Sequence, residues 1–249
     1  MRPLFIVLAA ALTLTASAGS VWGSDPGKSA SRGGPTAESE LPPFDQVAVQ
    51  GFTDVTLVQG NAEGIALEGS ADALRGLSLD VTDGMLTITN PHTRRWWVDF
   101  MGDGKPARIT LTYRKLNALT VEGAATVRAD RLVTDRLAVA ASGATSVRIG
   151  ALEANDLTVT GSGALKLEVT GRTVSQKIRI SGAGDYQAGK LDSQTAAVNV
   201  SGAGKVVLRA QKTLDVSVSG AGSVEYFGDP KVTQDIRGIG SIQRRGSAD

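Results

Sequence analysis

The stretch VSVSGAGSVEYFG, residues Val216–Gly228, carries an alternation of apolar and other residues that continues through two glycines. The apolar residues Val216, Val218 and Val224 share one side of this period-two pattern with Gly220 and Gly222. A period of two indicates a half-buried β-strand. Because glycine has no side chain to fill a core, two glycines on the buried side indicate a turn or a close backbone approach there.

The G-x-G-x-apolar core of this stretch recurs along the chain. Its copies, the first two of which lack the second glycine, begin at Gly123, Gly143, Gly161, Gly182, Gly202, Gly220 and Gly238. Successive copies lie 20, 18, 21, 20, 18 and 18 residues apart, and an alternating strand pattern precedes nearly every copy. A repeat of this length built from strands is typical of a solenoid, and the dense leucine pattern of leucine-rich repeats is absent. The sequence therefore predicts an all-β, parallel β-helix with coils of about 18–21 residues.

We interpret the paired glycines as structural. In a β-helix, equivalent residues of successive coils stack about 4.8 Å apart, so an inward glycine lets the coil pinch and brings its own backbone or the opposite wall close. The glycines concerned are Gly161, Gly163, Gly182, Gly184, Gly202, Gly204, Gly220, Gly222, Gly238 and Gly240. A phosphate-binding loop is the alternative, but no copy completes G-x-G-x-x-G or opens a helical pattern.

The chain divides into four segments. Residues 1–18 combine Arg2, an apolar stretch and an A-x-A arrangement ending at Ala18, which predicts a secretory signal peptide. An uncleaved anchor is the alternative, although the apolar stretch is shorter than the roughly 20 residues that a membrane span needs. Residues 19–43 are rich in Gly, Ser and Pro and predict a flexible linker. A single folded domain is expected over 44–245, with a tail at 246–249.

Composition excludes some classes of partner. Residues 1–18 contain one basic residue and no acid, and without them the chain has equal numbers of basic and acidic residues. A nucleic-acid-binding protein would need a strong basic excess, so none is expected. No transmembrane span is expected after signal cleavage, and the predicted location is the periplasm or the cell surface.

Four stretches resemble one known family. They are FDQVAVQG (residues 44–51), DGMLTI (83–88), ITLTYRKLNALTVEG (109–123) and the serial VSGAG copies that end in IRGIGSI (236–242). Together they resemble the "putative auto-transporter adhesin, head GIN domain" family of bacterial exported proteins over about residues 44–242. The resemblance implies a right-handed β-solenoid in the cell envelope. It implies no catalytic residue.

A search for catalytic chemistry finds no site. Outward acids on the glycine-bearing strand do not fall at matching positions of neighbouring coils, so no carboxylate pair for hydrolysis is predicted. The single histidine, His92, has no second His or Cys with which to share a metal, and is interpreted as a loop residue. No catalytic residue, metal site or cofactor is therefore expected.

Three features predict ligand binding. The residue before the first glycine forms a predicted hydroxyl row of Ser142, Thr160, Ser181, Ser201 and Ser219. Arg128, Arg148 and Lys166 recur five residues after that glycine and predict a strip for acidic glycans or lipid headgroups. The insertion at residues 90–105 contains Arg94, Arg95, Trp96 and Trp97, a combination typical of sugar-stacking and protein-contact sites. Each has a purely structural alternative: a polar face, a solvated face, and a cap over one end of the solenoid.

The sequence thus predicts an exported, non-catalytic β-solenoid that serves as an adhesin-like binding or structural element of the cell envelope. Glycans or other envelope polymers are the expected partners. Two alternatives stay open, since fold alone does not decide function. One is a polysaccharide lyase or hydrolase on the same scaffold. The other is a self-assembling envelope module that pairs through an open strand edge.

Overall fold

The computed structural model describes residues 36–69, 74, 76–90 and 107–246, and within these ranges the chain forms sixteen strands. In chain order they are β1 (Thr36–Glu40), β2 (Gln46–Gln59), β3 (Gly64–Glu68), β4 (Ser78–Thr82), β5 (Met85–Asn90), β6 (Arg108–Tyr113), β7 (Ala118–Ala129), β8 (Leu132–Val133), β9 (Arg136–Ile180), β10 (Ala183–Ala188), β11 (Leu191–Val200), β12 (Lys205–Arg209), β13 (Thr213–Val218), β14 (Ser223–Phe227), β15 (Lys231–Ile236) and β16 (Ser241–Arg244). The prediction of an all-β fold is confirmed. No helix within the described ranges is long and apolar enough to cross a membrane.

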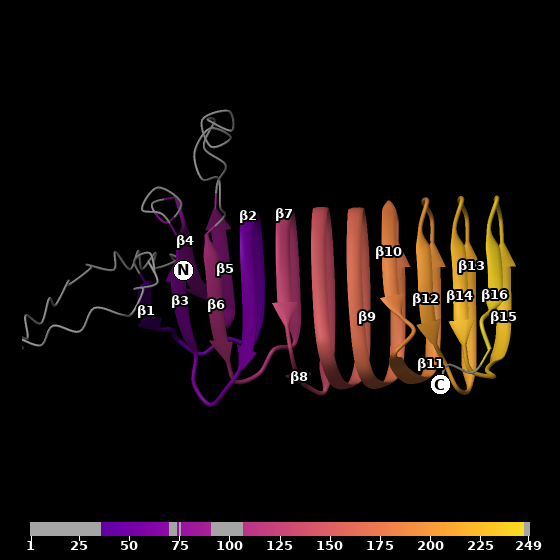
Figure 1. Cartoon of the computed structure of the whole chain (residues 1–249), viewed down its shortest axis with the longest axis horizontal. Coiled ribbons are helices and arrows are strands. Elements are labelled where there is room, and N and C mark those ends of the chain that lie inside the picture. The colour runs from indigo at the N-terminus through magenta and orange to yellow at the C-terminus, as the bar shows by residue number, and fades with distance from the viewer. Residues whose placement is uncertain (1–35, 70–73, 75, 91–106, 247–249) are drawn as a thin grey trace, which may run out of the picture.

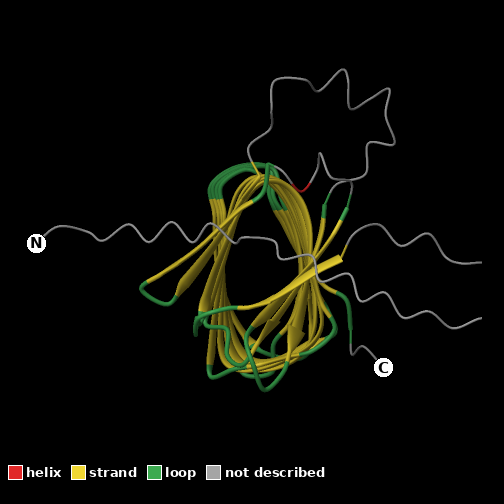
Figure 2. Cartoon of the chain, turned by 90° about the vertical axis from the view of Figure 1, so that its left-hand side faces the viewer, coloured by secondary structure: helices red, strands yellow, loops and turns green. Residues whose placement is uncertain are grey.

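The strands stack side by side along the long axis of the molecule (Figure 1). A view along that axis shows a flattened, ring-like cross-section with strands on two opposite faces (Figure 2). From β7 onward, neighbouring strands on each face are parallel, so that Asp185 lies beside Lys205 and Lys205 lies beside Ser223. We call each circuit of the chain around this cross-section a level, because equivalent residues of successive circuits lie directly over one another.

Alternating side chains from both faces fill the interior. In β13, for example, Leu214, Val216 and Val218 are buried while the residues between them face outward. Each buried aliphatic side chain of this kind stabilises the fold by roughly 1.5–3 kcal/mol. The core therefore extends along the stack as one continuous apolar column.

One fully bonded polar network interrupts this column. The Tyr186 hydroxyl donates to Gln176 Oε1 at 2.9 Å, and Gln176 Nε2 donates to Ser193 Oγ and to the Arg209 carbonyl oxygen. Burial raises the pKa of Tyr186 well above its ordinary value, so the phenol stays protonated and serves as a donor. Because each buried group has a partner, the network fixes the packing of these levels.

At the N-terminal end, antiparallel strands complete both faces. β3 pairs with β6, and β1 pairs with β3, while β4 pairs with β5 on the other face. The prediction of a linker over residues 19–43 is therefore wrong for Thr36–Glu40, which form an edge strand although the segment lacks apolar periodicity. Backbone pairing with β3 requires no such periodicity, which is why the sequence pattern misses the strand.

The glycines of the repeat lie where the chain bends from one face to the other. One glycine per level forms a row that we call the apex glycine ladder: Gly51, Gly123, Gly143, Gly163, Gly182, Gly202, Gly220 and Gly238. A Cβ atom on Gly163 would lie 2.6 Å from the carbonyl oxygen of Gly143, which is closer than carbon and oxygen approach. Glycine is needed here because of the backbone of the neighbouring level, and not because of the opposite wall.

The apex glycine ladder shows that the copy of the repeat beginning at Gly161 is misaligned by two residues in the sequence pattern. Gly163, and not Gly161, stacks between Gly143 and Gly182. Gly161 instead lies two residues before the apex, where a Cβ would be 2.7 Å from the Leu165 side chain. In the next level the large residue and the glycine are exchanged: Ile180 lies two residues before the apex glycine, and Gly184 lies two residues after it.

We call the residues two before and two after each apex glycine the apex pair. From Gly161 onward every apex pair contains one large apolar residue and one glycine: Gly161/Leu165, Ile180/Gly184, Val200/Gly204, Val218/Gly222 and Ile236/Gly240. The bend therefore has room for one large side chain per level, and either position can supply it.

Candidate functional site

A row of serines runs beside the apex glycine ladder, one residue before five of its eight glycines. The row is Ser142, Ser162, Ser181, Ser201 and Ser219. Ser162 therefore replaces Thr160, which the sequence pattern predicts, because the apex of that level is Gly163. The hydroxyls of Ser181 and Ser201 make only long contacts, 3.4 and 3.5 Å, with carbonyl oxygens of the preceding level. The row, which we call the hydroxyl row, exposes groups that can bond an external ligand.

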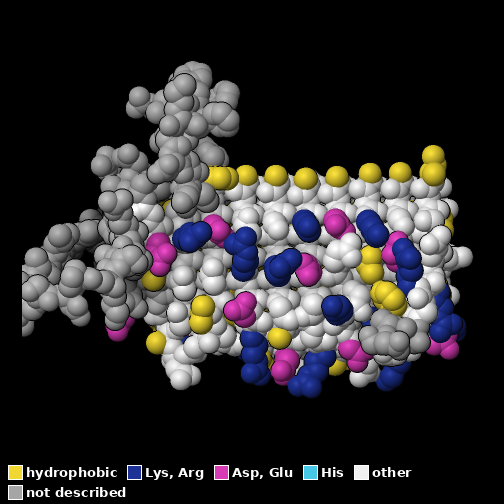
Figure 3. Space-filling model, in the orientation of Figure 1, with side chains coloured by type: hydrophobic (Ala, Val, Ile, Leu, Met, Phe, Trp, Pro, Cys, Tyr) yellow, Lys and Arg dark blue, Asp and Glu magenta, His cyan; other side chains and the backbone are white. Residues whose placement is uncertain are grey.

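A second row, one residue after each apex glycine, is apolar. It consists of Phe52, Ala124, Ala144, Ala164, Ala183, Ala203, Ala221 and Ile239, all of them exposed. Regularly spaced apolar side chains line one long edge of the molecule in Figure 3. We call this row the alanine ridge. Sequence analysis missed it, although its signal is present in the alanine between the two glycines of most copies.

The predicted cationic strip does not form as a ladder of three. Arg128 lies beside Arg148, but the residue in register with Arg148 on the following level is Glu168. Lys166 belongs to a different row, in which it lies beside Asp185. The reason is the same two-residue shift at Gly163, which moves every later residue of that level relative to the apparent repeat.

Both arginines of the strip have carboxylate partners. Arg128 contacts Asp54 at 2.5 Å, and Arg148 contacts Glu168 at 2.6 Å. Figure 3 shows basic and acidic side chains interspersed over this face, with no large area of one sign. The face therefore presents neutralised ion pairs, which offer less to an anionic ligand than three unpaired cations would.

A cluster of three charged side chains is centred on Glu225 of β14. Lys205 Nζ lies 3.4 Å from its carboxylate, and Arg245 donates two hydrogen bonds to it from the other side, at 3.0 and 2.9 Å. The hydrogen bond from Arg245, followed by that from Lys205, lowers the pKa of Glu225 below its ordinary value of 4.5. A carboxyl held ionised in this way is unsuited to act as a general acid near neutral pH.

The Glu225 cluster predicts a specific acid sensitivity. Because its pKa is lower in the folded than in the unfolded chain, Glu225 contributes stability above pH 4.5 that is lost as the pH falls through the folded-state value. Denaturation midpoints at pH 7 and pH 3 should therefore differ more for the wild type than for Glu225→Gln. The exposed pair of Asp235 with Arg237 supplies the control, since Asp235→Asn should leave the pH difference close to that of the wild type. Equal pH differences for Glu225→Gln and the wild type would contradict the assignment.

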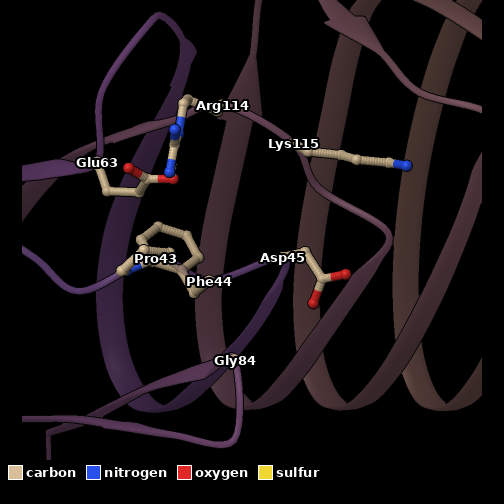
Figure 4. Close-up of a pocket in the computed structure, with 7 residues that line it drawn as sticks. All are labelled: Pro43, Phe44, Asp45, Glu63, Gly84, Arg114 and Lys115. Carbon is tan, nitrogen blue, oxygen red and sulfur yellow. Dashed lines mark hydrogen bonds and ion pairs between the residues drawn. The ribbon is translucent and has the colours of Figure 1, made fainter.

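Two open hollows of about 470 Å³ each lie near the N-terminal end. The first is lined by Pro43, Phe44, Asp45, Glu63, Gly84, Arg114 and Lys115. In Figure 4 the Arg114 side chain points to the Glu63 carboxylate, whereas Lys115 points away from it. Its charged groups are already bonded, Arg114 to Glu63 at 2.7 Å and Asp45 to Asn117 at 2.7 Å. Sequence analysis missed this hollow because its residues come from four separate segments.

Other candidates lie outside the described residues. They are the loop residues Arg94, Arg95, Trp96 and Trp97, and the single histidine, His92. Their assignment as a ligand-binding loop or a loop residue stays a prediction. Among the residues that the structure does describe, no group of three or more His, Cys, Asp or Glu side chains is placed to hold a metal ion.

Solved structures share this architecture. A protein from Bacteroides fragilis described as "a putative adhesin" matches with a TM-score of 0.75 and 22% identity, covering 84% of this chain and 96% of the other. A "putative lipid binding protein" from Parabacteroides distasonis matches with a TM-score of 0.65 and 17% identity over the same shares. A "putative adhesin" from Parabacteroides merdae gives 0.63 and 15%, covering 84% and 95%. At these identities the likeness shows the fold alone.

Sequence comparison identifies the family directly. No curated protein gives a significant match to the chain. The model of the family described as "Putative auto-transporter adhesin, head GIN domain" matches residues 43–230, most of the folded part. This range holds β2 to β14 and most of the apex glycine ladder. The chain belongs to the "Putative auto-transporter adhesin, head GIN domain" family.

Proposed function

We propose that this chain is an exported, right-handed β-solenoid of the bacterial cell envelope that binds glycans or other envelope polymers without cleaving them. Family membership and the description of two similar structures as "a putative adhesin" support this role. The single observation that carries it is the hydroxyl row beside the alanine ridge. The two rows together form an exposed surface of short side chains that repeats over the five successive levels from Gly143 to Gly220.

Such a surface suits a polymer better than a small molecule. Its hydroxyl and methyl groups recur at the strand spacing of about 4.8 Å, so an extended ligand can contact several levels at once. One hydrogen bond of this kind contributes only about 0.5–1.5 kcal/mol, but contacts made along one chain add as linked binding events. Small side chains also lose little conformational entropy on binding.

The charges of the described faces support a non-catalytic role. A polysaccharide hydrolase or lyase needs a carboxyl or basic group that can exchange a proton. Here Asp54, Glu168 and Glu225 are each held by a cation. An approaching ligand therefore meets carboxylates that are already engaged by cations.

Binding to a panel of neutral and acidic glycans and envelope-lipid vesicles tests the proposal. The chain without the predicted signal peptide (residues 19–249) would be used, together with Ser181→Gln/Ser201→Gln/Ser219→Gln. Long side chains in the hydroxyl row should weaken glycan binding roughly ten-fold or more, since they keep the ligand away from the row and three hydroxyl contacts are lost.

The matched control is Ser146→Gln/Ser223→Gln/Ser241→Gln, on the opposite side of the alanine ridge. Its binding should equal that of the wild type. Trp96→Ala/Trp97→Ala reports separately on the loop. Binding that survives in the hydroxyl-row variant but disappears in the tryptophan variant would assign the ligand to the loop. Shortened glycan products would refute the non-catalytic role, and failure to bind any member of the panel would refute the binding role.

A further inference from the structure

The C-terminal end of the stack exposes two strand edges. β15 pairs only with β13 and β16 pairs only with β14, so in the described part of the chain the outer N–H and C=O groups of both strands have no strand partner. Apolar side chains accompany these edges: Ile239 is 90% exposed and Ile236 is 38% exposed, while Val232 and Ile242 are half-buried against the core. This end therefore combines backbone groups and apolar surface that a further pair of strands would cover.

Within the described ranges, the N-terminal end of the same stack also ends in two strand edges. The face that ends in β16 begins with β1, and the face that ends in β15 begins with β4. β1 has five residues against four in β16, and β4 has five against six in β15. β1 also runs in the same direction as β16, because it is antiparallel to β3 and β3 is antiparallel to β6. The two ends of one molecule thus match in number and length of edge strands.

The charges of the two ends are complementary. The edge strands β1 and β4 contain three acids, Glu38, Glu40 and Asp80, and no basic residue. Residues 231–246 contain four basic residues and one acid. Arg237, Arg244 and Arg245 pair with Asp235, Asp229 and Glu225, so these groups together with Lys231 carry a net charge of +1. Contact between two C-terminal ends would bring the basic groups together, whereas contact between unlike ends brings opposite charges together.

We propose that the C-terminal end of one molecule binds the N-terminal end of a second copy, with β16 beside β1 and β15 beside β4. Because the two contacting surfaces differ, this interface does not close on itself and produces linear, head-to-tail oligomers along the stack axis. Gln234 and Arg244 stand in register with the inward Val216 and Tyr226, so polar groups occupy part of the interface. The association is accordingly weak and depends on protein concentration.

Sedimentation of residues 19–249 at increasing concentration tests the proposal, with two variants that each block one end. Ile236→Asp places a charge on the edge strand β15, at a position that is 38% exposed and lies outside the hydroxyl row and the alanine ridge. Glu40→Lys/Asp80→Lys reverses the charge of the N-terminal end. The wild type should form a series of species larger than a dimer that dissociate on dilution, and each variant alone should stay monomeric. An equimolar mixture of the two variants should form dimers, because each retains one intact end.

Three results would overturn the proposal. They are a wild type that stays monomeric up to its solubility limit, a Glu40→Lys/Asp80→Lys variant that dimerises alone through its C-terminal end, and a mixture that behaves as two monomers. Unchanged far-UV circular dichroism and melting temperature in both variants establish that folding is intact. Glycan binding by monomeric variants separates this result from the proposed function, since the hydroxyl row and the alanine ridge are intact in both.

Discussion

Gly163→Ala should lower the free energy of unfolding by roughly 3 kcal/mol or more. Two effects combine at this position. The new Cβ would lie 2.6 Å from the backbone carbonyl oxygen of Gly143, which cannot move without disturbing the ladder. In addition, the φ of Gly163 is 100°, a conformation that alanine rarely adopts. Urea denaturation followed by circular dichroism measures the loss.

Two other substitutions separate these effects. Gly182→Ala creates a similar clash with the Gly163 carbonyl oxygen, but Gly182 does not have a positive φ, so its loss should be smaller. Ala164→Ser, at the exposed neighbouring position, should change stability by less than about 0.5 kcal/mol. If Gly163→Ala were as mild as Ala164→Ser, close contact between levels could not be the reason for the apex glycine ladder.

The second large effect concerns the apex pair Ile180/Gly184. Ile180→Gly should cost about 3–5 kcal/mol because it leaves a cavity at the bend. Gly184→Leu should also destabilise, since a Cβ at Gly184 would lie 2.7 Å from Ile180 Cγ2. The double variant Ile180→Gly/Gly184→Leu reproduces the arrangement of Gly161 and Leu165 one level earlier. It should recover most of the loss, with a coupling energy of about 2–3 kcal/mol.

The comparison of single and double variants measures this coupling. Denaturation of all four proteins under one set of conditions gives the four free energies of unfolding. Val198→Ala/Gly184→Leu is a suitable control, because Val198 is buried in the core but does not belong to an apex pair. Its two losses should simply add. Additive losses in the Ile180/Gly184 cycle as well would mean that the bend has no fixed volume for one large side chain.

The periodic part of the fold could be predicted from the sequence. Alternation around residues such as Val216 and Val218 identifies half-buried strands, and the spacing of the glycines identifies stacked repeats. Both signals are local, because each level packs on its neighbours through the same positions. The antiparallel strand β1 could not be predicted, since its pairing with β3 depends on backbone hydrogen bonds and leaves no pattern in the side chains.

The predicted rows of site residues were partly wrong, for a single physical reason. Aligning copies by their first glycine assumes that the same glycine always lies at the apex, yet packing accepts the large residue on either side. At Gly161 and Leu165 the sizes are exchanged, so the apparent repeat slips by two residues. Lys166 then leaves the row of Arg128 and Arg148, and Ser162 takes the place of Thr160. A count from the apex glycine, and not from the first glycine, would have given the correct rows.

The stack also has a consequence for how this protein can evolve. Each level after β7 contacts only the levels before and after it. An additional level would need only a glycine at the bend and one large residue in the apex pair. Duplication of one level within the gene would therefore lengthen the molecule while leaving its existing contacts unchanged. The exposed residues between those fixed positions are free to diverge. The length of the stack and the chemistry of its exposed surface can thus change independently during evolution.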